Sequence, residues 1–232
     1  MFIYLPEVLA EFETSLSPER FATYLKATGN DREKAARLYT WNTAISAAFY
    51  GPLQALEISL RNAMHRQLAH TYGACWYDNP AAGLDSRAAA RITDAKRDLQ
   101  RNGHAADPPD IVAALSFGFW VALLGAGGRL SPPQQGNASY ERTLWRPALH
   151  RTFSNAGPWN RKGALGPLNA LRLLRNRIAH HEPVFARNLG EDYRNILDVL
   201  GWISAHKRNW VEVHCRVPSL LALPRDAPGV TL

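Results

Sequence analysis

The chain has 232 residues, enough for one domain that buries a sizeable hydrophobic core. Hydrophobic residues make up 46% of it, which excludes an intrinsically disordered chain. Lysine and arginine outnumber aspartate and glutamate by 27 to 20, a net charge of +7. This balance favours a polyanionic partner such as nucleic acid, although a solvated basic surface would give the same composition.

The cysteines and the N-terminus indicate a protein of the reducing cytoplasm. Cys75 and Cys215 lie far apart and form no CxxC pair, so neither a disulfide framework nor a zinc knuckle is expected. Residues 1–7 lack a basic region and turn acidic at Glu7, which is not the pattern of a signal peptide. We therefore expect a cytoplasmic protein that uses no metal and no cofactor.

Capping and breaking signals predict helices along the first hundred residues. The sequence Ser-Pro-Glu at 17–19 predicts a helix start, and residues 30–33 have the spacing of a capping box before an apolar face. Gly51-Pro52 predicts the end of that helix and the start of another, which ends near Gly73. Asp85 or Ser86 predicts the cap of a charged helix that ends near Gly103.

One uncharged stretch, Ile111–Gly128, has the length at which a membrane span becomes possible. Its four glycines, and the lack of a second such stretch, favour a buried core helix, with a membrane-associated protein as the alternative. The glycine- and proline-rich segment Gly125–Asn137 predicts a surface loop within one fold. Helices are again predicted over residues 140–153, 165–181 and 192–210.

No strand pattern, repeat or low-complexity segment interrupts this series. The sequence therefore predicts an all-α protein, with a single domain over residues 1–215 and an irregular C-terminal tail over residues 216–232 that contains three prolines. Trp41, Trp120, Trp145 and Trp202 are interpreted as core residues.

The segment LGPLNALRLLRNRIAHHEPVF at 165–185 carries the residues suited to chemistry. On a helical wheel, Arg175 falls on the apolar arc that holds Leu168, Leu171 and Leu174. A guanidinium at such a position needs an anionic or hydrogen-bonding partner. Arg175 therefore either pairs with a carboxylate in a helical core or serves a functional site.

Two histidines end this predicted helix. Pro183 disfavours helical geometry at the residue before it, which places His180 and His181 in the last turn, where the helix dipole favours the imidazolium form. Asn176 is four residues before His180 and shares its face. Cleavage of a phosphodiester without a metal needs one group that moves protons and another that neutralises the phosphorane. The same string also fits histidines that only end a helix.

The string RNRIAHHEPVF at 175–185 resembles the Arg-x4-6-His signature of the HEPN ribonuclease superfamily. More narrowly, the chain resembles the Abi-like (abortive infection) family over roughly residues 20–215. Four blocks in order carry the likeness: YTWN at 39–42, LEISLRN at 56–62, LSFGFW at 115–120, and Trp145 after the loop.

This resemblance implies a HEPN-like helical bundle with additional helices, acting as a metal-independent endoribonuclease in phage defence or toxin–antitoxin control. It implies a homodimer in which two copies of the motif form one composite site. Arg175 and His180 match the catalytic pair, Asn176 the polar position after the arginine, and His181 is a further catalytic candidate. Glu182 stands where some branches carry a modifiable tyrosine, so control through that tyrosine is not expected. The alternative is an inactive module that holds a noncoding RNA.

Basic and paired residues around the motif complete the candidate site. The candidates for RNA binding are Arg172, Arg177, Arg91, Lys96 and Arg97, of which the last three equally fit a solvated helix face. Glu57 and Arg61 are four apart, which fits either an ion pair along one helix or support for the active-site arginine. The echo of the motif at residues 61–65 has the wrong spacing and is interpreted as structural.

Overall fold

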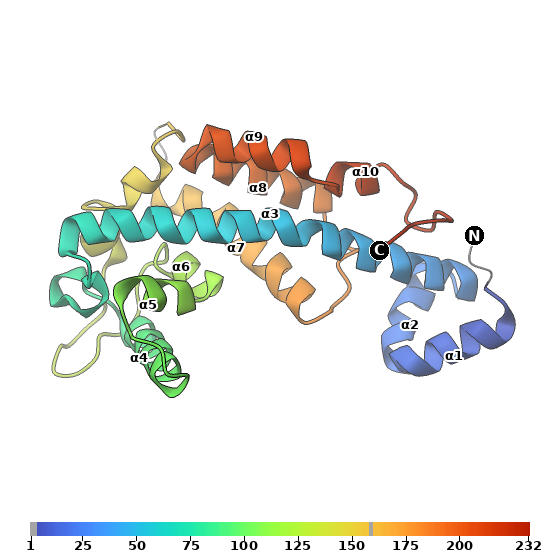
Figure 1. Ribbon diagram of the computed structural model, residues 1–232, viewed down its shortest axis with the longest axis horizontal. Helices are drawn as coiled ribbons and strands as arrows, with labels where there is room; N and C mark the ends of the chain where they lie inside the picture. The colour runs from blue at the N-terminus through green and yellow to red at the C-terminus, as the bar shows by residue number, and fades with distance from the viewer. Residues whose placement is uncertain (1–3, 158–159) are drawn as a thin grey trace.

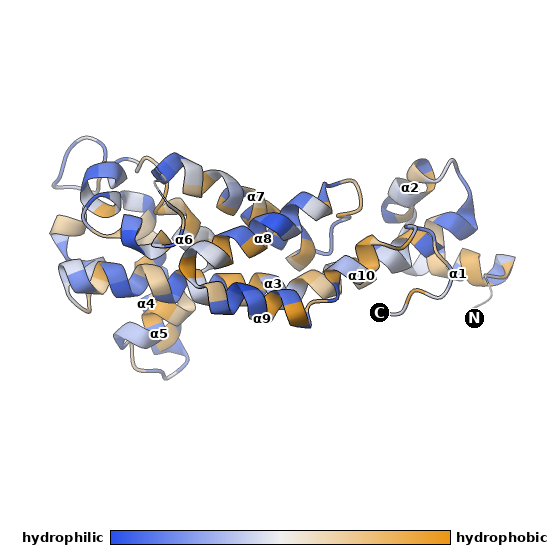
Figure 2. Ribbon diagram, turned by 90° about the horizontal axis from the view of Figure 1, so that it is seen from above, coloured by the Kyte–Doolittle hydropathy of each residue, from blue (hydrophilic) through white to orange (hydrophobic). Residues whose placement is uncertain are grey.

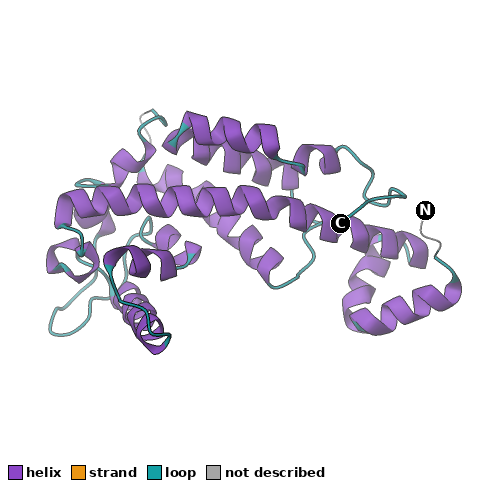
Figure 3. Ribbon diagram, in the orientation of Figure 1, coloured by secondary structure: helices purple, strands orange, loops and turns teal. Residues whose placement is uncertain are grey.

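The computed structural model describes residues 4–157 and 160–232, and the described part contains helices and loops but no strand (Figure 3). This confirms the all-α prediction. The elements are α1 (Pro6–Leu16), α2 (Pro18–Ala27), α3 (Arg32–Tyr72), η1 (Trp76–Asp78), η2 (Pro80–Ala82), α4 (Ser86–Arg101), α5 (Pro108–Ala114), α6 (Phe117–Ala122), η3 (Glu141–Trp145), η4 (Leu149–Phe153), α7 (Arg161–Ala179), α8 (Leu189–Ile203), α9 (Ala205–His214) and α10 (Val217–Leu221).

The 41-residue helix α3 is the axis of the fold (Figure 1). Helices α1 and α2 pack near its N-terminal end, α8 and α9 run along one side, and α4, α5 and α6 gather near its C-terminal end. Helix α1 and the C-terminal end of the chain lie near the same end of α3. Asp31 caps α3, because its Oδ1 accepts a hydrogen bond from the Lys34 amide at 3.0 Å.

The prediction that Gly51-Pro52 ends a helix is wrong, because α3 continues through both residues. A proline removes one backbone hydrogen bond from a helix interior and ordinarily disfavours it. Here the apolar face stays in register across the proline, and Phe49, Leu53 and Leu56 are all buried. Packing of this face against the rest of the protein outweighs the lost hydrogen bond.

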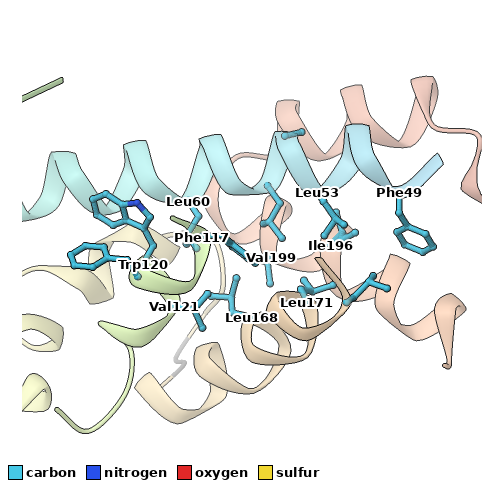
Figure 4. Close-up of a cluster of buried hydrophobic side chains, with 14 of the residues drawn as sticks. Phe49, Leu53, Leu60, Phe117, Trp120, Val121, Leu168, Leu171, Ile196 and Val199 are labelled. Atoms are coloured by element: carbon cyan, nitrogen blue, oxygen red, sulfur yellow. The ribbon is translucent and has the colours of Figure 1, made fainter. Parts of the chain in front are cut away.

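The core lies where α3 meets α6, α7 and α8 (Figure 4). Most helices alternate hydrophobic and hydrophilic residues around their circumference, as Figure 2 shows. The side chains that meet in the core are Phe49, Leu53 and Leu60 from α3, Phe117, Trp120 and Val121 from α6, Leu168 and Leu171 from α7, and Ile196 and Val199 from α8. The core assignment of Trp41, Trp120 and Trp145 is confirmed, and Trp202 packs against the core while remaining partly exposed.

The uncharged stretch Ile111–Gly128 contributes to the core, but it does not form the single helix that was predicted. It divides into the end of α5 and all of α6, and Ser116 between them accepts a hydrogen bond from the Phe119 amide at 3.3 Å. Within residues 4–157 and 160–232, no helix combines the length and the apolar character needed to cross a membrane.

Three predicted segments differ from the structure after residue 137. Residues 140–153 form a short π-helix and a 3-10 helix, η3 and η4, in place of one α-helix. The predicted helix at 192–210 is divided into α8 and α9 at Ser204, whose Oγ accepts from the Lys207 amide at 3.3 Å. The segment predicted as an irregular tail begins with α10, which Trp41 holds against α3 by donating from Nε1 to the Leu220 carbonyl at 3.1 Å.

Candidate functional site

Helix α7 positions the motif. Its N-cap is Asn160, whose Oδ1 accepts from the Gly163 amide at 2.8 Å, and the helix begins at Arg161, before the predicted residue 165. Leu168, Leu171 and Leu174 are fully buried and fix the rotation of α7 against the core. This rotation leaves the arginines and the asparagine of the motif on the remaining faces of the helix.

Arg175 lies at the edge of the apolar arc and not inside it as predicted. Its side chain is 42% exposed, and its Nε lies 3.7 Å from Oε2 of Glu57 on α3. Arg61 donates to the Ala113 carbonyl at 3.3 Å, so Glu57 pairs with the motif arginine and the interpretation as support for Arg175 is the one the structure favours. A partly exposed pair at this distance is weak. An anion that approaches this surface can therefore compete with Glu57 for the guanidinium.

Arg175 borders two cavities. The larger cavity, which we call the arginine cleft, has a volume of about 650 Å³ and is lined by residues of α4, α6 and α7 and of the loop after α6. Arg172, Arg175 and Asn176 line it from α7, and Arg87 and Arg91 line it from α4. The smaller cavity, the α3–α7 hollow, has a volume of about 390 Å³ and is lined by nine residues: Tyr50, Leu53, Gln54, Glu57, Ile58, Arg61, Arg175, Ile178 and Ala179.

The two histidines lie directly after α7, which ends at Ala179 and not at the predicted residue 181. His180 is the C-cap, and His181 adopts a left-handed backbone with φ of +55°. The His181 amide donates to the Ile178 carbonyl at 3.0 Å and the Glu182 amide to the Arg177 carbonyl at 2.8 Å, the hydrogen bonds of a Schellman turn. Glycine is usual at the left-handed position, where another residue costs on the order of 1 kcal/mol. Both imidazoles are exposed, and they line neither cavity.

The segment after the histidines is anchored to α3 by a buried side chain. Oδ1 of Asn42, which is 5% exposed, accepts from the amides of Val184 and Phe185 at 2.8 and 3.1 Å. These two backbone donors are buried and would otherwise lack partners. Asn42 therefore fixes the path of the chain that leaves the motif helix.

An ion pair between Arg187 and the buried Asp192 ties the same segment to α7 and α8. Arg187 donates from Nε and Nη2 to the two carboxylate oxygens of Asp192 at 3.0 and 2.8 Å, and from Nη2 to the Ala170 carbonyl at 3.3 Å. Sequence reasoning missed the roles of Asn42 and Asp192. The available signal was a polar residue on the apolar face of a predicted helix, as at Asn42 beside Trp41 and Ile45.

The structure divides the predicted RNA-binding residues into two sets. Arg172 and Arg91 line the arginine cleft, and Arg172 donates from Nε and Nη2 to Asn169 Oδ1 at 3.0 and 2.9 Å. The others are engaged elsewhere: Lys96 pairs with Asp78 at 2.6 Å, Arg97 with Asp94 at 3.3 Å, and Arg177 with Glu182 at 3.4 Å. Arg87, which sequence reasoning did not select, joins the first set.

Two further groups near the site are structural. Oδ1 and Oδ2 of Asp85 accept from the amides of Ala88 and Gly128 at 2.8 and 2.7 Å, and the Tyr140 hydroxyl accepts from the Asp85 amide at 3.1 Å. Burial raises the pKa of Tyr140, so its phenol stays protonated at neutral pH. These contacts shape the wall of the arginine cleft beside the loop that follows α6.

His65 belongs to the segment that echoes the motif. Its Nδ1 accepts a hydrogen bond from Nε1 of the buried Trp76 at 3.1 Å, and burial lowers the pKa of the imidazole. This environment agrees with the structural interpretation of residues 61–65.

Across residues 4–157 and 160–232, no group of three histidine, cysteine, aspartate or glutamate side chains is arranged to hold a metal ion. Comparisons of the chain with protein-family profiles, with characterised proteins and with solved structures found no match.

Proposed function

We propose that this protein is a metal-independent endoribonuclease of the HEPN type. The observation that carries the proposal is the placement of the motif: Arg175 and Asn176 line a basic cleft, and His180 and His181 stand exposed at the end of the same helix. The helical bundle around α3, α7 and α8 supports a HEPN-like fold with additional helices. The resemblance to Abi-like proteins supports a role in phage defence or toxin–antitoxin control.

The proposed reaction uses the 2′-hydroxyl of the RNA as the nucleophile. Its oxygen forms a bond to the adjacent phosphorus, and the bond from phosphorus to the 5′-oxygen of the next nucleotide breaks. A histidine of the motif accepts the 2′-hydroxyl proton or protonates the leaving oxygen. Arg175 stabilises the additional negative charge on the phosphorane through charge-assisted hydrogen bonds. The products are a 2′,3′-cyclic phosphate and a 5′-hydroxyl.

The direct test is the incubation of purified protein with RNA, with an Arg175→Ala variant beside it. We expect the wild-type protein to cleave RNA and the variant to lose both cleavage and part of its affinity, because an arginine contacts the phosphate in the ground state as well as in the transition state. Binding of RNA without cleavage by the wild-type protein would replace the proposal with an inactive RNA-binding module.

The exposed surface beside Arg175 suggests how the site is completed in a homodimer. Tyr50 and Ile58 line the α3–α7 hollow and are 66% and 38% exposed. A twofold contact brings the same patch of both chains together. In such a dimer the hollow and the two motif helices would face each other, and the histidines of one chain would approach the arginine of the other.

We predict that Tyr50→Arg combined with Ile58→Arg converts a homodimer into a folded monomer with little nuclease activity, because two charges would be buried in an apolar contact. Light scattering on a sizing column measures the mass. The control is Val213→Arg, a change at a 69% exposed residue of α9, which should leave the dimer intact. A wild-type protein that is monomeric at micromolar concentration and fully active would contradict the composite site.

A further inference from the structure

We propose that the arginine cleft binds the phosphate next to the scissile one in a single strand of RNA. This inference rests on the proposed function and adds to it a subsite that the histidines do not line. Four arginines from two helices line the cleft: Arg87 and Arg91 from α4, and Arg172 and Arg175 from α7. The arginines of α4 and those of α7 are at least 81 positions apart in the sequence, yet their guanidinium groups line the same cleft.

The charge of these arginines is available to a ligand. Among the described residues, no carboxylate lies within 4.0 Å of the guanidinium nitrogens of Arg87, Arg91 or Arg172, whereas the fourth cleft arginine, Arg175, pairs with Glu57. The two arginines of α4 that do not line the cleft, at positions 97 and 101, are both paired with aspartates. Asp85 is the one acid among the described residues that line the cleft, and both of its oxygens already accept backbone hydrogen bonds. The cleft therefore presents a strong positive potential to an anion.

The shape of the cleft suits a narrow ligand. Small residues, Gly118, Gly127 and Gly128, form part of its lining. A side chain at Gly127 would meet the Ala138 carbonyl oxygen at 2.8 Å, so this part of the wall is closely packed backbone. The volume of about 650 Å³ lies within the range of roughly 300–1,000 Å³ that is typical of small-ligand sites. This space suits one or two nucleotides of a single strand, and not a duplex.

The cleft begins at the motif, because Arg175 and Asn176 line the cleft. The histidines of the motif lie after the end of α7 and do not line it. A strand whose scissile phosphate contacts Arg175 can therefore continue into the cleft, where its neighbouring phosphate meets Arg87, Arg91 and Arg172. The contact with this second phosphate is independent of bond cleavage. It should raise kcat/KM for substrates that carry a flanking phosphate.

The first experiment compares short substrates. A dinucleoside monophosphate has only the scissile phosphate, and the same dinucleotide with an added 5′- or 3′-phosphate has one more. We expect the wild-type protein to gain at least about tenfold in kcat/KM from the extra phosphate on one of the two sides, the effect of a charge-assisted contact. Arg87→Ala with Arg91→Ala should lose most of this gain, so that it cleaves the extended and the unextended dinucleotides with similar kcat/KM.

The matched control is Arg101→Ala with Arg146→Ala. These two arginines are 72% and 74% exposed, pair with Asp98 and Glu141, and do not line the cleft. The control removes the same net charge and should keep the gain from the extra phosphate. An equal loss in the control, or no gain in the wild-type protein on either side, would overturn the proposal.

The second experiment measures binding alone and separates this inference from the proposed function. The probe is a fluorescent 2′-O-methyl RNA oligonucleotide, which lacks the nucleophile and cannot be cleaved. Arg87→Ala with Arg91→Ala should weaken binding by at least about tenfold and reduce the slope of log K against log salt by about 1.4, since each contact to a single strand contributes about 0.7. If the protein cleaves no RNA but this result is obtained, the cleft is confirmed as an RNA-binding site and the proposed nuclease function is rejected.

A variant that fills the cleft without changing charge completes the test. A Cβ at Gly118 would meet Arg172 Cδ at 3.7 Å and Ser116 Oγ at 3.8 Å, ordinary contacts that the backbone tolerates. Gly118→Leu should therefore fold, as thermal denaturation can verify, and should lower the affinity for the same oligonucleotide at least about tenfold. A stable Gly118→Leu protein with wild-type affinity would show that the strand does not enter the cleft.

Discussion

Replacement of His180 by alanine is expected to lower kcat for RNA cleavage by about 10²- to 10⁴-fold, the usual contribution of a positioned acid or base. The affinity for RNA should stay within a few-fold, because His180 is exposed and lines neither cavity. The fold should be preserved, since the hydrogen bond at this position joins the His180 amide to the Asn176 carbonyl at 2.9 Å and does not involve the side chain. Single-turnover cleavage and fluorescence anisotropy measure the two effects separately.

The products identify the reaction that His180 serves. If the 2′-hydroxyl is the nucleophile, the products carry a 2′,3′-cyclic phosphate and a 5′-hydroxyl, DNA resists cleavage, and activity survives EDTA. A water activated by a metal ion would instead leave a 5′-phosphate and require magnesium. His206→Ala changes another exposed histidine, on α9, and should be fully active. Full activity in a His180→Ala, His181→Ala double variant would refute the role of both imidazoles.

The helical class and the position of the motif could be predicted from the sequence because both depend on local signals. Caps, prolines and apolar spacing act within one or two turns, so the starts of α2 and α4 were correctly located and the end of α7 was located to within two residues. The break at Gly51-Pro52 was wrongly predicted for the opposite reason. The unfavourable local effect of the proline is overcome by tertiary packing of a face that runs from Leu38 through Phe49 and Leu53 to Leu68.

The composition of the candidate site depended on contacts that no local pattern encodes. Arg175 meets Glu57 across two helices although the two residues are more than a hundred positions apart in the sequence, and the spacing of Glu57 and Arg61 alone fitted an ion pair along one helix. Arg91 and Arg97 are alike in the sequence, yet one faces the arginine cleft and the other pairs with Asp94. The buried residues of α4 fix the rotation of this helix about its axis. This rotation decides which of its arginines faces the cleft and which pairs with an aspartate.

Asp192→Ala is expected to have the largest effect on stability, about 3 kcal/mol in the free energy of unfolding. Asp192 is 4% exposed and accepts two hydrogen bonds from Arg187, so its loss leaves a guanidinium in the protein without its charged partner. The estimate is at the lower end for a broken buried pair because the Arg187 side chain is 22% exposed and can recruit water. For a chain of this length, this corresponds to a fall in Tm of roughly 6–12 °C.

Asp198→Ala is the matched control, since it removes the same group from the same helix. Asp198 is 52% exposed and lies 3.8 Å from Arg208, a surface pair expected to contribute less than about 1 kcal/mol. Asp192→Asn should fall between the two, because the amide oxygen can still accept one of the Arg187 hydrogen bonds. Thermal and urea denaturation measure all three variants. If Asp192→Ala unfolds with the same free energy as Asp198→Ala, the Arg187–Asp192 pair does not hold the segment between α7 and α8, and the histidines must be positioned by Asn42 and the Schellman turn alone.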